Sequence, residues 1–232
     1  MHLLRWLALI LLLPVALASA AYVLTATNVV PDRYNPLTPL DLAERPNPIT
    51  GIKLWLMSGN HAACVSALRR AGVAFQEMPT RSEGPYCLRR GTVTIGKFSA
   101  ATLEPEEMNC GMALRLYLLE RHDIQPLARS YFGAGVERIH HFGSYSCRKI
   151  RGGSSMSEHT TANAFDLAGF RLSNGRTVSL KQDWQGSGPA SAFLHEVRTR
   201  ACLLFNMVLS PDYNTDHADH FHFDMGWLMG CH

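Results

Sequence analysis

Apolar residues along the chain fall into short stretches with two different periods. Residues 92–98 (TVTIGKF) alternate between apolar and polar side chains, which is typical of a strand with one buried face. Residues 105–121 and 189–207 instead repeat every three to four positions, which predicts helices. Pro105 and Pro189 stand at the start of these two runs, where proline is tolerated because the first N–H groups of a helix have no partner within it. The pattern therefore predicts both helices and strands.

Shorter stretches complete this pattern. Residues 59–72 are expected to form a further helix that ends at Gly72. Four more segments are strand-like: 136–142, 164–172, 176–181 and 219–225. Helices and strands are mixed without the regular alternation that builds a parallel sheet. We therefore expect an α+β fold in which a small, largely antiparallel sheet is flanked by helices.

The N-terminal 24 residues form an apolar segment with one charge, Arg5. A positive start, an apolar run from Trp6 to Leu24 and the small residues at 18–20 fit a secretory signal. A run of about 20 apolar residues is also long enough for a membrane anchor. Both interpretations stay open. Either one makes the protein periplasmic, secreted or tethered to the inner membrane through residues 6–24, because Arg5 stays on the cytoplasmic side.

The rest of the chain is expected to hold a spacer and one folded domain. Residues 25–50 contain five prolines, which oppose a helix or a central strand, so we expect a spacer there. Residues 51–232 carry the periodic segments and form the predicted domain. Hydrophobic residues make up 47% of the chain and charged residues 18%, a composition that favours a packed core over disorder.

Charge and cysteine content narrow the environment of this domain. The net charge of +3 is too small for a dense basic face, so we expect no nucleic-acid partner. A mildly basic surface is compatible with an anionic polymer such as peptidoglycan. Six cysteines, none in a C-x-x-C pair, predict up to three disulfides in an exported chain, with buried free thiols as the alternative.

Histidines gather near the C-terminus. His217, His220 and His222 lie within six residues of one another. If residues 219–225 form a strand, His220 and His222 share one face while the two phenylalanines beside them point into the core. Two imidazoles on one face repel when both are protonated, and a bound metal ion removes that problem. The pattern indicates a metal site, with a histidine-rich edge strand as the alternative.

A catalytic zinc ion needs more than this strand supplies, since it takes three protein ligands and leaves one position for water. His159 ends a Gly/Ser-rich loop, and Asp166 lies on the strand-like segment that follows. Loops commonly present ligands, and the small Ala162 and Ala164 allow this loop to approach a metal closely. The H-x6-D spacing is weak alone but becomes specific when H-x-H follows about fifty residues later.

This pattern, H-x6-D followed by H-x-H, resembles that of the zinc peptidase group, which includes D-Ala-D-Ala carboxypeptidases, lysostaphin-type endopeptidases and the hedgehog signalling domain. The spacing of His217, His220 and His222 is most similar to the penicillin-insensitive murein endopeptidases. Over roughly residues 50–231 the chain resembles the bacterial extensin-like C-terminal domain family. The segments that carry this likeness are 143–148 (GSYSCR), 157–159 (SEH), 164–166 (AFD), Cys202 and 217–224 (HADHFHFD).

The resemblance implies a zinc-peptidase fold and a Zn²⁺ ion held by His159, Asp166 and His222. It also implies that His220 is the base that activates the zinc-bound water. Arg148 is similar to the arginine of a Tyr-Arg motif that faces the substrate carbonyl or carboxylate in the carboxypeptidases, although Cys147 comes between the two elements of the motif here.

The base remains open between two residues. Carboxypeptidases of this group use a glutamate three residues before the last histidine ligand, and Asp219 has that spacing from His222. On a strand Asp219 faces away from His222, which favours His220, whereas a turn before residue 220 favours Asp219. His217 and Asp224 are expected next to the ligands, and Asp224 is placed to orient an imidazole.

The expected function is hydrolysis of peptide bonds in peptidoglycan by an exported zinc enzyme. Zinc lowers the pKa of bound water to about 7, and a base within reach removes the proton as the amide carbonyl is attacked. Zinc and Arg148 then stabilise the oxyanion. The alternatives are a non-catalytic, zinc-containing domain that binds the cell wall and a disulfide-stabilised wall-binding protein without a metal.

Overall fold

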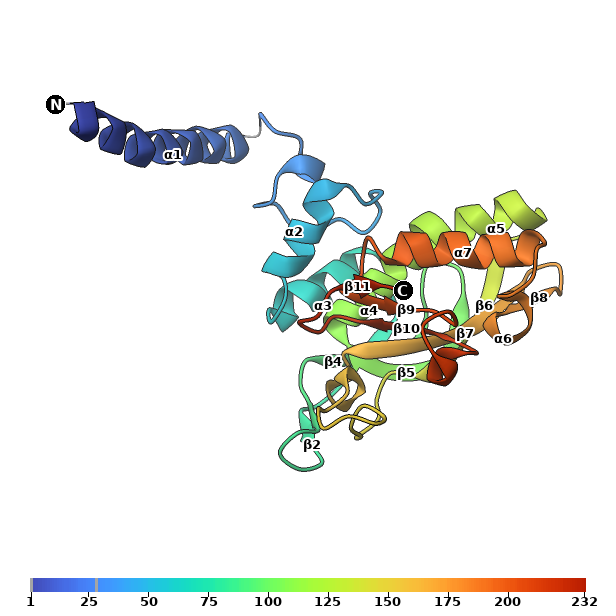
Figure 1. Ribbon diagram of the computed structural model, residues 1–232. Coiled ribbons are helices and arrows are strands. Elements are labelled where there is room, and N and C mark those ends of the chain that lie inside the picture. The colour runs from blue at the N-terminus through green and yellow to red at the C-terminus, as the bar shows by residue number, and fades with distance from the viewer. Residues whose placement is uncertain (1, 28) are drawn as a thin grey trace.

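The computed structural model describes residues 2–27 and 29–232 (Figure 1). Met1 and the side chains of residues 2–11 belong to the expected export signal and lie outside the described part. Helix α1 (His2–Ala26) extends away from the rest of the molecule. Within the described residues, no helix combines the length and the apolar character needed to cross a membrane.

The segment expected to be a spacer is partly built into the fold. It contains a 3-10 helix, η1 (Asp32–Tyr34), and the start of helix α2 (Pro48–Leu56). Leu40 and Leu42 are buried in the hydrophobic core. Prolines prevent regular structure without preventing burial, so the second half of residues 25–50 belongs to the folded body and not to a spacer.

A nine-stranded sheet forms the centre of the described structure, in the order β1-β4-β5-β6-β7-β10-β9-β11, with β8 paired to β7. Neighbouring strands are antiparallel except in the β5–β6 and β9–β11 pairs. The strands are β1 (Phe75–Glu77), β4 (Thr92–Lys97), β5 (Thr102–Asn109), β6 (Val136–Gly143), β7 (Ala164–Leu172), β8 (Thr177–Ser179), β9 (Met207–Leu209), β10 (Phe221–Asp224) and β11 (Gly230–Cys231). A separate hairpin pairs β2 (Arg81–Ser82) with β3 (Leu88–Arg89). This confirms a mixed α+β fold with a mainly antiparallel sheet, although the sheet is larger than the small one expected.

Helices cover this sheet. Helices α5 and α7 lie side by side along it (Figure 1) and contact each other. The helices of the folded body after α2 are α3 (His61–Arg70), α4 (Cys110–Leu119), the π-helical turn η2 (Glu120–Ile124), α5 (Gln125–Phe132), η3 (Glu158–Thr161), α6 (Leu180–Asp183), α7 (Pro189–Ala201) and η4 (Thr215–His217). The apolar faces of α4 and α7 are buried, as their helical periodicity predicts.

The helix expected over residues 105–121 begins later than predicted. Residues 105–109 form the end of β5 and pair with β4, and α4 starts at Cys110. The Asn109 side chain caps the helix by accepting a hydrogen bond from the Gly111 N–H at 2.9 Å. Strand pairing therefore overrides the local preference of a proline and two glutamates for a helix start.

The helix expected over residues 189–207 also differs from the structure. It ends at Ala201, and Met207 already begins β9. The remaining predicted elements coincide with α3, β4, β6, β7, β8 and β10 to within a few residues at either end.

Three disulfides tie distant parts of the chain together. They join Cys64 to Cys110, Cys87 to Cys147, and Cys202 to Cys231. No free cysteine remains among the described residues. This confirms the expected disulfides over free thiols, and it indicates an extracellular or periplasmic environment. The second bridge also anchors the loop after β6, which contributes to the site described next.

Candidate metal centre

Two neighbouring strands and a short helix place three candidate ligands together. Strands β7 and β10 pair in the middle of the sheet, with His222 directly opposite Asp166. His159 lies on η3, just before β7. Ala162 ends η3 in the left-handed region, at φ 53°, and so turns the chain from η3 into β7. His159 and Asp166 therefore come from one stretch of the chain and His222 from a distant one, and the three side chains converge at one point.

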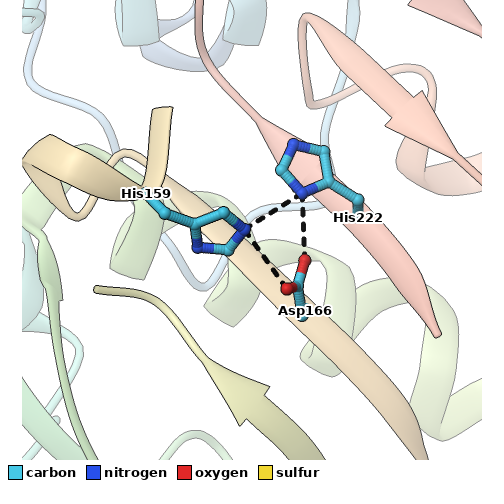
Figure 2. A group of neighbouring side chains, drawn as sticks. All are labelled: His159, Asp166 and His222. Carbon is cyan, nitrogen blue, oxygen red and sulfur yellow. Dashed lines mark hydrogen bonds and ion pairs between the residues drawn. The ribbon is translucent and has the colours of Figure 1, made fainter. Parts of the chain in front are cut away.

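The atoms that face this point are close together (Figure 2). His159 Nε2 lies 3.2 Å from His222 Nδ1 and 3.2 Å from Asp166 Oδ2. His222 Nδ1 lies 2.9 Å from Asp166 Oδ1. In a tetrahedral zinc site with metal–ligand distances of about 2.0–2.1 Å, neighbouring ligand atoms are about 3.3 Å apart. The observed spacing therefore suits a metal ion. The side chains of His159, Asp166 and His222 are only 4%, 12% and 11% exposed, so an ion held by them would be largely shielded from water.

The outer nitrogens of both imidazoles are already engaged. His159 Nδ1 donates a hydrogen bond to the Ser144 carbonyl at 2.9 Å, and His222 Nε2 donates one to Asp224 Oδ2 at 3.1 Å. Both partners can only accept, so each neutral ring carries its lone pair on the nitrogen that faces the centre. When both rings are neutral, two lone pairs and the Asp166 carboxylate meet in this buried place, which either a proton on His222 or a bound cation can occupy. This arrangement fits a cation, and the outer bonds are those that orient metal-binding histidines.

Buried charge shifts the titration of these groups. Burial raises the pKa of Asp166, but hydrogen bonds with His159 and His222 outweigh it and hold that pKa well below its usual range. Burial lowers the pKa of His222, but hydrogen bonds with Asp166 and Asp224 outweigh it and raise the pKa to about 9. Both shifts reflect contact between imidazole and carboxylate, which favours the ionised carboxylate and the protonated ring.

The two candidates for the base contact each other. His220 Nε2 lies 3.6 Å from Asp166 Oδ1, and His220 Nδ1 lies 2.9 Å from Asp219 Oδ1. The predicted strand over residues 219–225 begins only at Phe221, after a turn, so the expected alternation of faces does not apply to His220 and Asp219. His220 therefore lies next to the ligand set through its Nε2. Asp219, whose side chain is 41% exposed, contacts the other ring nitrogen of His220.

His217 also lies beside the converging ligands. Its ring centroid is 5.3 Å from that of His220 and 5.8 Å from that of His222. Its Nδ1 is 2.7 Å from Asn214 Oδ1. Burial, followed by the neighbouring His222 and His220, lowers the pKa of His217 to about 4. His217 is therefore neutral at neutral pH and adds no charge that competes with a cation.

Arg148 is less closely associated with the centre. It lies on the exposed loop after β6, where its carbonyl accepts a hydrogen bond from the Ser157 N–H at 3.1 Å. Among the described residues, no hydrogen bond or ion pair holds its side chain. The structure therefore places its backbone next to the segment that carries His159, and its role toward a substrate stays a prediction.

Three residues near the centre were not predicted as part of it. Ser144 contributes a carbonyl oxygen to His159, Asn214 holds His217, and the exposed ring of Phe142 lies 5.5 Å from that of His220. The GSYSCR motif contains Ser144, but a backbone acceptor gives no signal in its own side chain. Asn214 and Phe142 are typical of many loops and strand ends, so no pattern singled them out.

Comparison with known proteins gives a family for the chain. A family model described as "Extensin-like protein C-terminus" matches residues 62–232, a range that includes all the candidate ligands. No curated protein and no solved structure matches the chain. Since the matched range covers well over half of the 232 residues, this protein belongs to the extensin-like protein C-terminus family.

Proposed function

We propose that this protein is an exported zinc-dependent peptidase with a zinc-peptidase fold that hydrolyses peptide bonds in bacterial peptidoglycan. One observation carries the proposal. Three buried ligand atoms, on His159, Asp166 and His222, lie about 3 Å apart, which is the spacing of neighbouring ligands around a tetrahedral zinc ion.

His159, Asp166 and His222 would hold the ion. When bound, zinc polarises a carbonyl group and lowers the pKa of a water molecule to about 7. Two neutral imidazoles and one carboxylate leave a net positive charge at the centre, which favours a developing oxyanion. The outer contact between Asp224 and His222 Nε2 would keep the His222 ring in the orientation that presents Nδ1.

His220 and Asp219 would together move the proton. Asp219 accepts from His220 Nδ1–H, which leaves the Nε2 lone pair to take a proton from the attacking water. Nε2 is the nitrogen that faces Asp166 and the ligand set, so His220 serves as the base and Asp219 as the residue that orients it. Arg148, on its exposed loop, would approach the carbonyl or carboxylate of a bound peptide.

The peptidoglycan substrate rests on resemblance and location. The arrangement of ligands resembles that of cell-wall peptidases, and three disulfides favour an extracytoplasmic site. The net charge of +3 is compatible with an anionic wall polymer. Secretion after signal cleavage or tethering to the inner membrane would both bring the domain to this substrate.

Digestion of purified muropeptides, combined with metal analysis, tests the proposal. We expect wild-type protein to contain about one zinc ion and to cleave peptide bonds. His159→Ala should lose both metal and activity, whereas His220→Ala should keep the metal and lose activity by about 10²–10⁴-fold. Zinc without any cleavage would identify a metal-containing wall-binding domain instead. Absence of stoichiometric zinc would refute the peptidase and leave a disulfide-stabilised wall-binding protein.

A further inference from the structure

A cavity is lined by residues outside the candidate metal centre. It is a cavity of about 450 Å³ beside the π-helical turn η2, and we call it the arginine-lined cavity. Its lining residues are Ala43, Ser99, Ala100, Arg121, His122, Gln125 and Arg129. None of them belongs to the ligand set or to the elements that carry it. Cavities of this size accommodate small ligands, and π-helical turns are frequent at functional sites.

A buried carboxylate fixes one wall of this cavity. Glu120 has no exposed surface and accepts hydrogen bonds from the N–H groups of Ser99, Ala100 and Ala101, at 3.1, 3.1 and 3.0 Å. It also accepts from the Ser99 hydroxyl and from Gln125 Nε2 at 2.8 Å. The N–H groups of Ser99 and Ala100 and the Ser99 hydroxyl are therefore directed to Glu120 and are not free to bind a ligand.

The other neutral polar groups are also used within the protein. Gln125 Nε2 donates to the Val136 carbonyl at 2.8 Å, and its Oε1 accepts from the Val136 N–H at 3.1 Å. His122 Nε2 donates to the Leu42 carbonyl at 2.9 Å. The absence of a side chain at Gly135 preserves this arrangement, because a Cβ there would lie 2.8 Å from Gln125 Oε1 and 3.4 Å from Arg129 Nη1.

Arg121 and Arg129 differ from these groups. Both are exposed, and among the described residues neither makes an ion pair or a side-chain hydrogen bond to another side chain. No carboxylate lines the cavity. The nearby Asp123 is 3.9 Å from Arg200 instead. Two guanidinium groups are thus the charged donors left at the edge of a preformed cavity.

We propose that the arginine-lined cavity binds an oxyanion group, a phosphate or a carboxylate, between Arg121 and Arg129. A guanidinium presents a planar fork of N–H donors that matches either group, and both arginines line the same cavity. This site is independent of zinc, so its failure would leave the proposed peptidase activity untouched.

Titration calorimetry at low ionic strength, with the full-length protein, tests this site. Inorganic phosphate and acetate are the two probes, and saturable binding of one of them with a stoichiometry near one is the expected result. Arg121→Ala and Arg129→Ala should each weaken that binding by about 10–100-fold, because each removes charge-assisted hydrogen bonds. The probe that binds more tightly identifies the group as phosphate or carboxylate.

Arg90→Ala is the matched control. Arg90 is also exposed, lies outside the cavity and carries the same charge, so its loss should leave binding unchanged. Arg121→Lys should restore part of the affinity, since the charge remains but the fork is lost. Absence of saturable binding of both probes, or an equal loss in Arg90→Ala, would overturn the proposal.

Discussion

Two of the buried carboxylates, those of Glu120 and Asp166, have contrasting surroundings. Glu120 is completely buried and receives five hydrogen bonds, three of them from consecutive backbone N–H groups. Asp166 is 8% exposed and faces the inner nitrogens of His159 and His222. The first cluster has a proton for every contact. In the second cluster the three inner atoms are all acceptors when both rings are neutral, so a proton on His222 or a bound cation has to lie among them.

This difference shows what distinguishes a structural cluster from a candidate metal centre. Burial of a carboxylate is common to both, so burial alone does not identify function. A surplus of donors around Glu120 stabilises the ionised form without any further partner. A surplus of acceptors around Asp166 is costly unless a cation or an extra proton occupies the centre. The balance of donors and acceptors therefore separates the two clusters.

Replacing Asp166 should have the largest effect on this comparison. Asp166→Asn removes the one anionic ligand, so we expect zinc affinity to fall by more than about 100-fold and hydrolysis to become undetectable. Zinc content after dialysis against a weak chelator measures the loss. Glu120→Gln is the control, because folded protein with that change should keep its zinc. Stoichiometric zinc in Asp166→Asn would contradict the assigned ligand set.

Replacing Glu120 should lower the free energy of unfolding and leave metal binding unchanged. Glu120→Ala leaves three backbone N–H groups and one of the two N–H groups of the Gln125 amide without their acceptor, so we expect a loss of about 3 kcal/mol or more. Urea denaturation, monitored by circular dichroism, measures the free energy of unfolding. Zinc content of the folded protein should not change. A loss below about 1 kcal/mol would mean that water replaces the carboxylate and that the cluster is less closed than its geometry indicates.

Replacing Asp224 should have an intermediate effect. Asp224→Asn keeps an oxygen for the Gly226 N–H but removes the negative charge next to His222 Nε2. Loss of such an orienting carboxylate costs about 10–100-fold in metal affinity. Competition with a fluorescent zinc chelator measures the change, and Glu104→Gln, at a highly exposed position, is the control. Unchanged affinity would show that strand pairing alone orients the His222 ring.

The residues of the Asp166 cluster could be predicted from the sequence, but those of the Glu120 cluster could not. The H-x6-D and H-x-H spacings indicate the candidate residues, and the family resemblance implies the choice of His159, Asp166 and His222 among them. In the structure His222 and Asp166 lie on strands that pair. The Glu120 cluster has no such signal. Its donors are backbone groups at residues 99–101, and their meeting with Glu120 depends on how the β4–β5 turn packs against η2.

The fold shows the same division. Strands with one buried face, such as β4, are visible as alternation, whereas β1, β9 and β11 have only two or three residues and no readable period. The start of α4 was misplaced because residues 105–107 suit both a helix start and a strand, and pairing with β4 decides between them. Sequence periodicity describes single elements, while strand pairing is a property of the whole structure.

The smallest predicted effect concerns the pair of residues behind the ligand set. Asp219→Asn keeps a hydrogen-bond acceptor for His220 Nδ1 but removes a charge that is 41% exposed, and exposed ion pairs are worth little in water. We therefore expect about a ten-fold lower rate of hydrolysis, with unchanged zinc content. Initial rates of muropeptide hydrolysis and metal analysis measure the two quantities. A loss as large as that of His220→Ala would instead make Asp219 the base, and would reverse the order in which the two side chains act.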